Sequence, residues 1–191
     1  MKFWPQKTWK RIVFILVLVV IAAFVTFGAF AGLLMSGMIN REVVSDVDIV
    51  NADGAKTALV VYQPGFSSFP RDASYAFAEG LASSGWRVEI TTASPQAPSD
   101  LSKYGLLVLG FPNYGSIPGT AIVNYVNRME TLDGINTVII SCAGGTSTAS
   151  IDTLKQKVQA ANGTFYDGLA LSNQDSSAME SAQQAGNNIS P

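Results

Sequence analysis

The sequence has no histidine and only one cysteine, and both shortages limit what its own side chains can do. Without histidine, Ser–His–Asp triads, imidazole acid–base catalysis and imidazole metal ligation are excluded. A single Cys142 cannot build an all-cysteine iron–sulfur cluster, a cysteine-rich zinc site or an internal disulfide. We therefore expect no metal partner, and any redox chemistry must be carried by an organic cofactor.

Positive charge is also scarce beyond the N-terminal segment. From Arg41 to the C-terminus the chain holds 8 lysines and arginines against 14 aspartates and glutamates, a net charge of −6. Nucleic-acid binding needs clustered positive charge to neutralise phosphates. No nucleic-acid partner is expected for such an acidic segment.

A long uncharged apolar run, residues 12–35, lies near the N-terminus. As a helix rising about 1.5 Å per residue it would measure roughly 36 Å, enough to cross a hydrocarbon core of about 30 Å. We predict that 12–35 is a transmembrane helix in contact with membrane lipid. The alternative is a cleaved signal peptide, for which Ala29-Phe30-Ala31 is a small-x-small cleavage sequence. Signal cores usually run roughly 7 to 15 residues, so the length of this run favours the retained anchor.

The charges on either side of the run predict its direction. Four basic residues lie in segment 1–11, whereas only Arg41 follows the run closely. Basic flanks stay in the cytoplasm. We therefore expect a single-pass membrane protein with a basic cytoplasmic flank at 1–11 and an extracytoplasmic domain. Residues 36–56 show no long apolar period and are predicted to be a mostly extended tether.

Beyond residue 56 the sequence alternates between short apolar runs and helical patterns. Continuous apolar runs are typical of strands buried on both faces; they lie at 58–62, 86–92, 106–109, 137–141 and 165–171. Helical patterns follow them, beginning at Pro70 and near residues 122, 151 and 178. Strands alternating with helices over short links predict a five-stranded parallel sheet covered on both faces, in the order 2-1-3-4-5. This α/β domain should span 57–186, with a tail at 187–191.

In that strand order, the loops leaving strands one and three diverge and open a ligand crevice. The loop after strand one contains Gly65, Phe66, Ser67 and Ser68, just before the helix that begins at Pro70. Phosphate groups are bound by close backbone, hydroxyl donors and the positive end of a helix. These residues are therefore candidates for phosphate binding. The alternative is that the serines only cap the helix.

The loops after strands three and four carry the segments Gly110-Phe111-Pro112-Asn113-Tyr114-Gly115 and Cys142-Ala143-Gly144-Gly145. They resemble the Gly-x-Pro-x-Tyr-Gly and Ala-Gly-Gly flavin loops of the flavodoxin family, and the resemblance spans about 57–186. It implies FMN as cofactor, with Tyr114 against the isoalloxazine ring. It also implies that the backbone of neighbouring residues approaches the flavin: Pro112, Asn113, Gly115, Ala143, Gly144 and Gly145. Read without the resemblance, these segments are a Pro/Gly turn with one exposed tyrosine and a glycine turn into a helix.

The first loop departs from the family. Flavodoxins carry a Thr/Ser-x-Thr-Gly-x-Thr phosphate loop, whereas this chain has Gln63-Pro64-Gly65-Phe66-Ser67-Ser68, in which only the glycine and the hydroxyls correspond. Cys142, at a strand end, is interpreted as core packing.

The leading hypothesis is a membrane-anchored FMN-binding protein in electron transfer, with a redox partner protein or a quinone and with no catalytic side chain of its own. The alternative is a flavin-free binding or assembly module at the membrane, which the altered first loop favours. A hydrolase is excluded, since there is no Gly-x-Ser-x-Gly elbow and no histidine.

Overall fold

The computed structural model describes residues 8–39 and 42–191, with side chains for 8–33 and 42–191. The chain divides into two compact units, residues 1–39 and 40–191. The part of the expected basic flank at 1–7 lies outside the described residues.

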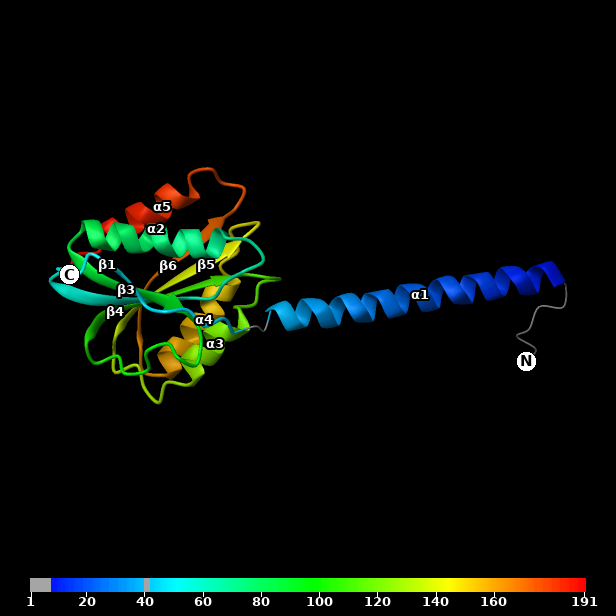
Figure 1. Ribbon diagram of the computed structural model, residues 1–191, viewed down its shortest axis with the longest axis horizontal. Coiled ribbons are helices and arrows are strands. Elements are labelled where there is room, and N and C mark those ends of the chain that lie inside the picture. Colours follow the sequence, from blue (N-terminus) through cyan, green and yellow to red (C-terminus); the bar gives the residue numbers. More distant parts are fainter. Residues whose placement is uncertain (1–7, 40–41) are drawn as a thin grey trace. The chain divides into compact units, whose positions relative to one another are not determined.

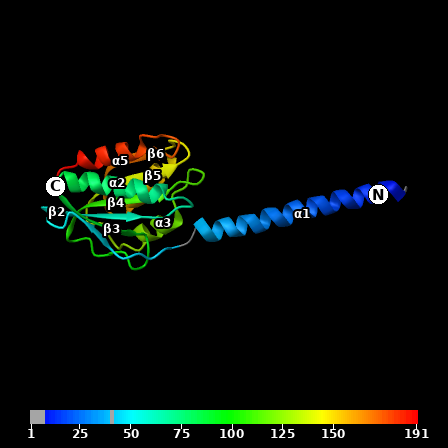
Figure 2. The same cartoon turned by 45° about the horizontal axis from the view of Figure 1, so that its top comes forward.

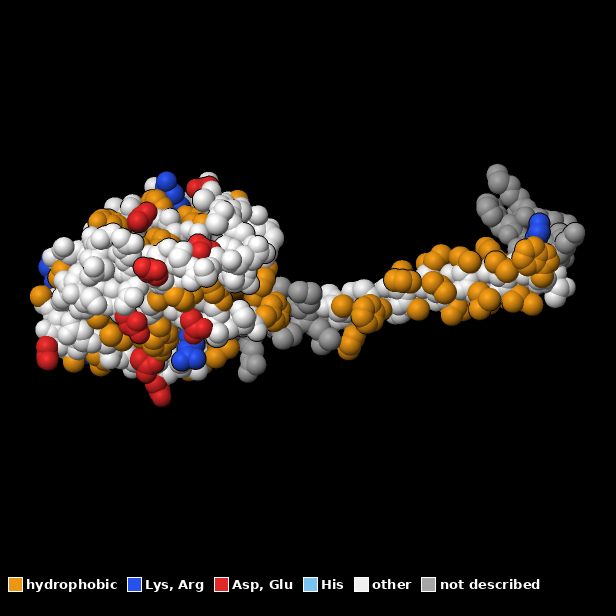
Figure 3. Space-filling view, turned by 90° about the horizontal axis from the view of Figure 1, so that it is seen from above, with side chains coloured by type: hydrophobic (Ala, Val, Ile, Leu, Met, Phe, Trp, Pro, Cys, Tyr) orange, Lys and Arg blue, Asp and Glu red, His pale blue; other side chains and the backbone are white. Residues whose placement is uncertain are grey.

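The first unit is one helix, α1 (Thr8–Ile39), which contains the whole of the apolar run. Figure 3 shows apolar side chains along the part of α1 whose side chains are described, residues 8–33. The hydroxyl of Thr26 donates to the carbonyls of Ala22 and Ala23 at 2.9 and 3.0 Å, so this polar group is satisfied within the helix. The segment Thr8–Leu33 is long and apolar enough to cross a membrane, a property that signal sequences near an N-terminus share.

The second unit is an α/β domain in which strands and helices alternate along the chain (Figure 1). Its elements are β1 (Asp48–Val50), β2 (Lys56–Tyr62), α2 (Phe69–Ser83), β3 (Trp86–Thr92), β4 (Tyr104–Pro112), α3 (Thr120–Asn127), β5 (Asn136–Ala143), α4 (Ala149–Ala160), β6 (Thr164–Ser172) and α5 (Ala178–Asn187). The strands form one sheet in the order β1-β3-β2-β4-β5-β6.

The sheet is mixed, with six strands. Strands β2 to β6 are parallel and run β3-β2-β4-β5-β6, the relative order expected for them. The expectation of a five-stranded, wholly parallel sheet is wrong by one strand. β1 pairs antiparallel with β3 at the edge, with Ile49 opposite Glu89, and it comes from the segment 36–56 that was expected to be a tether. Because β1 is short and its side chains are largely exposed, no buried apolar run marks it in the sequence.

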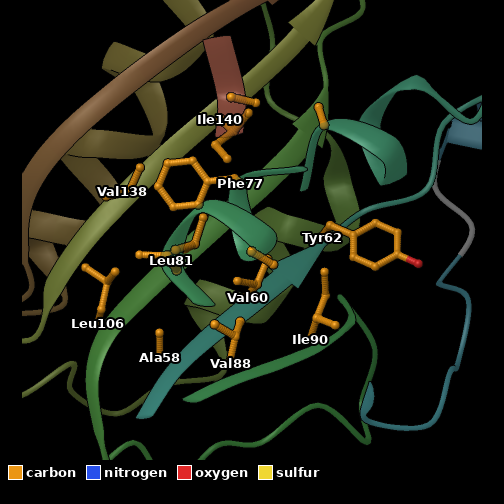
Figure 4. Packing of buried hydrophobic residues seen from close by; sticks show 14 of the residues in the cluster. Ala58, Val60, Tyr62, Phe77, Leu81, Val88, Ile90, Leu106, Val138 and Ile140 are labelled. Atoms are coloured by element: carbon orange, nitrogen blue, oxygen red, sulfur yellow. The ribbon is translucent and has the colours of Figure 1, made fainter. Parts of the chain in front are cut away.

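Each central strand is apolar throughout because helices cover both faces of the sheet. Val60 and Val108 face α2 and α5, whereas Leu59 and Leu107 face α3 and α4, and all four are fully buried. Figures 1 and 2 show α2 and α5 side by side over one face. Figure 4 shows Phe77 of α2 beside the strands in this layer. Parallel pairing under two helical layers therefore explains the continuous apolar runs.

Residues on both sides of 57–186 also pack on the domain. Arg128 forms an ion pair with Glu42 at 3.2 Å. At the other end, the indole N–H of Trp86 donates to the carbonyl of Ile189 at 2.8 Å, and Ile189 is buried.

Helices α2 and α5 approach each other through two glycines. A Cβ atom at Gly80 would lie 2.0 Å from the carbonyl oxygen of Gln183, and one at Gly186 would lie 2.2 Å from that of Phe77. Both obstacles are backbone atoms, so a larger residue could be accommodated only by moving the helices apart.

Gln63 links the end of β2 to β4 and to the start of α3 through hydrogen bonds. Its backbone N–H donates to the carbonyl of Gly110 at 2.8 Å. Its buried Oε1 accepts from the N–H of Ile122 at 3.2 Å, and a Cβ at Gly119 would lie 2.1 Å from that oxygen. The loop that carries Tyr114 is therefore fixed at both of its ends.

We predict that Gly80→Ala lowers the free energy of unfolding by about 1–3 kcal/mol, because the added methyl group overpacks a backbone contact. Thermal and denaturant unfolding followed by circular dichroism would measure this. The control is Gly145→Ala, whose Cβ would meet no atom within 4 Å. Equal stability of the two variants would contradict the close packing of α2 on α5.

Gln63→Ala should lower the free energy of unfolding by about 1–3 kcal/mol, because the buried N–H of Ile122 loses its acceptor. The matched control is Gln96→Ala at an exposed position, where about 0.5 kcal/mol or less is expected. Denaturant titration of both variants decides the matter, and an unchanged midpoint for Gln63→Ala would show that its side chain does not hold α3.

Candidate functional site

The carboxyl ends of the parallel strands form one continuous edge. Backbone hydrogen bonds join neighbouring ends: Ala93 N–H to Tyr62 carbonyl at 2.8 Å, Asn113 N–H to Cys142 carbonyl at 2.8 Å, and Asn173 N–H to Ala143 carbonyl at 2.9 Å. The loops after β2, β4, β5 and β6 therefore begin along the same edge of the sheet, as parallel pairing requires.

Strands β4 and β5 extend several residues further into this edge than their apolar runs indicated, and β6 extends to Ser172. β4 continues through Gly110 to Pro112, and β5 continues to Ala143, with Pro112 opposite Cys142 in the register. Pro112 and Ala143 are therefore strand residues, and the loops proper begin at Asn113 and Gly144. Both residues remain candidates for backbone contact with a ligand. The sheet fixes the position of that backbone.

The loops after β2 and β4 contact each other directly. The backbone N–H of Phe66 donates to the hydroxyl of Tyr114 at 2.9 Å, and the two ring centroids lie 5.1 Å apart at an interplanar angle of 54°. A Cβ at Gly65 would lie 3.1 Å from the same hydroxyl oxygen. Phe66 itself is 48% exposed, so its ring lies at the surface while it contacts the ring of Tyr114.

The loop after β4 contains a buried polar atom without a partner. Asn113 is only 9% exposed, and its Oδ1 accepts no hydrogen bond from any residue that the structure describes. Two left-handed residues follow Tyr114, Gly115 at φ 74° and Ser116 at φ 67°. A buried acceptor that lacks a donor is costly, and left-handed non-glycine backbone is strained, so both features are typical of a ligand-binding loop.

The loop after β5 presents bare backbone. A Cβ at Gly145 would meet nothing within 4 Å, and one at Gly144 would meet only the side-chain oxygen of Asn173, at 3.9 Å. Cys142, just before this loop, is buried, and burial raises the pKa of its thiol to about 12. Its thiol is thus protonated at neutral pH, in agreement with its interpretation as a packing residue.

The two serines of the first loop lie in a different place from Tyr114. Ser67 and Ser68 line a cavity of about 360 Å³ together with Asn173 and Asp175 of the loop between β6 and α5. Ser68 is the N-cap of α2, yet its side chain makes no capping hydrogen bond. The capping interpretation therefore does not hold for Ser68.

The loop after β6 is the part of this edge that the sequence analysis missed. The segment 172–175 is polar and directly follows the fifth predicted strand, so the rule that selected the other three loops would also have selected this one. Within the described residues, no group of three or more Cys, Asp or Glu side chains could hold a metal ion. The arrangement offers aromatic, amide and backbone contacts, which suit binding of a ligand that carries its own chemistry.

No protein-family model and no curated protein sequence matches this chain. Solved structures do resemble it. An archaeal flavodoxin has a TM-score of 0.59 at 14% identity and is matched over 70% of this chain and 95% of its own. The Megasphaera elsdenii flavodoxin has a TM-score of 0.58 at 16% identity, over 69% and 99%. An azoreductase from Bacillus anthracis has a TM-score of 0.56 at 10% identity, over 70% and 100%. The domain therefore has the flavodoxin-like α/β fold.

Proposed function

We propose that this chain is a flavin-binding redox protein, with FMN as its flavin, held on a membrane by residues 12–35. The arrangement that carries the proposal lies at the carboxyl edge of β4 and β5. There an aromatic ring at Tyr114, an unpartnered buried acceptor at Asn113 and the open backbone at Gly144 and Gly145 occur together.

Each of these groups suits a flat heteroaromatic ring. The Tyr114 ring can stack on its face, which contributes about 0.5–1.5 kcal/mol beyond area burial. Asn113 Oδ1 can accept a hydrogen bond from an N–H at the ring edge, which would satisfy the buried atom. The remaining contacts would come from the backbone and side chains of Gly65, Phe66, Ser67, Ser68, Pro112, Gly115 and Ala143. The flavin, when bound, supplies the electron transfer; these residues bind and orient it.

The proposed location follows from the N-terminal helix. Its apolar segment would contact lipid, the flank 1–11 would stay in the cytoplasm, and the domain would lie outside it. Soluble nicotinamide donors are scarce in such a compartment. A redox partner protein or a quinone is therefore the proposed electron partner.

A flavin-free binding or assembly module is the second candidate. The contact between Phe66 and Tyr114 favours it, because the tyrosine ring on which a flavin would stack already contacts a residue of the first loop.

Titration with FMN separates the two candidates. The full chain in detergent should quench FMN fluorescence with a micromolar dissociation constant. Tyr114→Ala should weaken binding by roughly five- to thirtyfold, or about 1–2 kcal/mol, because the stacking surface is lost.

The matched control is Tyr166→Ala, which removes an exposed tyrosine from β6. It should leave the dissociation constant unchanged. If the parent chain quenches no FMN at micromolar concentrations, FMN binding is excluded and the second candidate stands. If both tyrosine variants lose affinity equally, Tyr114 is not the stacking residue.

A further inference from the structure

The segment that precedes β1 meets the domain at the carboxyl edge of the sheet. The carbonyl of Val43 accepts a hydrogen bond from the hydroxyl of Thr92, and the hydroxyl of Ser45 accepts one from the N–H of Thr92 at 3.1 Å. Thr92 is the last residue of β3. Glu42 accepts a hydrogen bond from the side chain of Asn124 in α3 at 3.2 Å. The chain therefore enters the domain beside the carboxyl ends of the strands.

Only a short stretch of chain separates this entry point from the proposed membrane segment. Six residues, 36–41, lie between Met35, the last residue of the apolar run, and Glu42. Because a chain advances at most about 3.6 Å per residue, the seven steps from Met35 to Glu42 cover at most about 25 Å. When residues 12–35 span a bilayer, Glu42 lies no further than this from its hydrocarbon core. The carboxyl edge beside Glu42 can therefore reach the lipid surface.

Four loops at this edge carry no charged side chain. They follow β2, β3, β4 and β5 and occupy 63–69, 93–99, 113–119 and 144–148. Carboxylates begin beyond them, with Asp72 in the first turn of α2 and Asp175 in the loop after β6. At the opposite edge, the connections 100–103 and 128–135 are charged. Charges are costly to remove from water, so the uncharged edge is the one suited to contact with lipid.

Exposed apolar side chains occur on the same edge. In the second unit, as far as its residues are described, six large apolar side chains are exposed, and three of them are Val44, Phe66 and Ile117. Val44 lies between the two residues that bond to Thr92, and Phe66 contacts Tyr114, three residues before Ile117. Ile117 is the most exposed of the six, at 67%. Apolar groups held at the lipid interface are what anchors a peripheral surface to a bilayer.

We propose that the carboxyl edge of the sheet docks on the surface of the bilayer that holds the chain, with Phe66 and Ile117 in the interfacial region. The lipid it contacts is zwitterionic, because the net charge of −6 from Arg41 onward is repelled by anionic headgroups. Docking turns the loops after β2 and β4, and with them Tyr114, toward the lipid. The inference rests on the membrane anchoring in the proposed function and does not require a bound flavin.

A fluorescent label at position 117 of the full chain tests this contact. Ile117→Cys is labelled with a thiol-reactive, environment-sensitive fluorophore and reconstituted into phosphatidylcholine vesicles, in which some lipids carry a nitroxide quencher near the headgroup. Cys142 is buried and the pKa of its thiol is raised to about 12, so the parent chain should take up no label.

The matched control is Tyr166→Cys, which carries the same label at an exposed position of β6. A strand rises about 3.3 Å per residue, so position 166 lies roughly 20 Å from Ser172 at the carboxyl end of β6. The label at position 117 should lose at least about half of its fluorescence, because docked apolar groups lie about 5–10 Å into the headgroup boundary. The label at position 166 should lose less than about a tenth, given its distance from the carboxyl edge.

A charge placed at the docked surface gives a second measurement. Phe66→Asp, added to the labelled Ile117→Cys chain, should reduce the quenching at least about twofold, because a carboxylate is costly to remove from water. Tyr166→Asp in the same labelled chain should leave the quenching unchanged. Quenching that Phe66→Asp does not reduce would overturn the role of Phe66.

Equal quenching at positions 117 and 166 would overturn the proposed docking. A blue-shifted label at position 117 that the nitroxide lipids do not quench would also overturn it, because a second copy of the chain would then cover this face. A chain that alkaline washing removes from the vesicles is not anchored, and the inference fails with the anchor. The FMN titration reports flavin binding independently of all these outcomes.

Discussion

Parallel pairing of β2, β4, β5 and β6 is the constraint on which the site depends. Because parallel neighbours point the same way, their carboxyl ends meet at one edge, and loops far apart in sequence begin side by side there. The pairing persists to the last residue of each strand, as the bond from Asn113 N–H to the Cys142 carbonyl shows. The side chain of Gln63 also bonds the start of α3 to the end of β2. The Tyr114 loop is therefore held between a strand end and a helix start. The site is thus built on rigid elements, and its loops are short.

Two groups of residues near this edge have different physical characters. Around Asn113, Tyr114 and Gly145 there is bare backbone, an aromatic ring and an acceptor without a donor, all of which suit a flat neutral ring. The described residues that line the cavity beside the N-terminus of α2 include Asp72 and Asp175 and no lysine or arginine. The structural resemblance, at 14–16% identity for the two flavodoxins and 10% for the azoreductase, describes the fold alone and does not distinguish the two regions.

The sequence predicted the parts of the fold that burial determines. A strand covered on both faces must be apolar at every position, so runs such as 58–62 marked the parallel strands. Strand β1 could not be predicted from an apolar run, because Asp48–Val50 is held by backbone pairing to β3 and its side chains are largely exposed. The contact between Phe66 and Tyr114 joins residues 48 positions apart, and no local pattern encodes it. The site residues could be named from strand ends, but their contacts depend on how the loops fold onto each other.

For the proposed flavin, the closed contact between Phe66 and Tyr114 would lower the affinity without preventing binding. An aromatic pair contributes about 0.5–1.5 kcal/mol and a hydrogen bond about the same, so opening the contact costs about 1–3 kcal/mol. Micromolar binding corresponds to about −8 kcal/mol, which is several times larger. When only a fraction of molecules is open, the apparent dissociation constant rises by the inverse of that fraction, here roughly five- to 150-fold. In the proposed complex, the first loop and the flavin would therefore compete for the same tyrosine ring, and the difference between the two contacts would set the affinity.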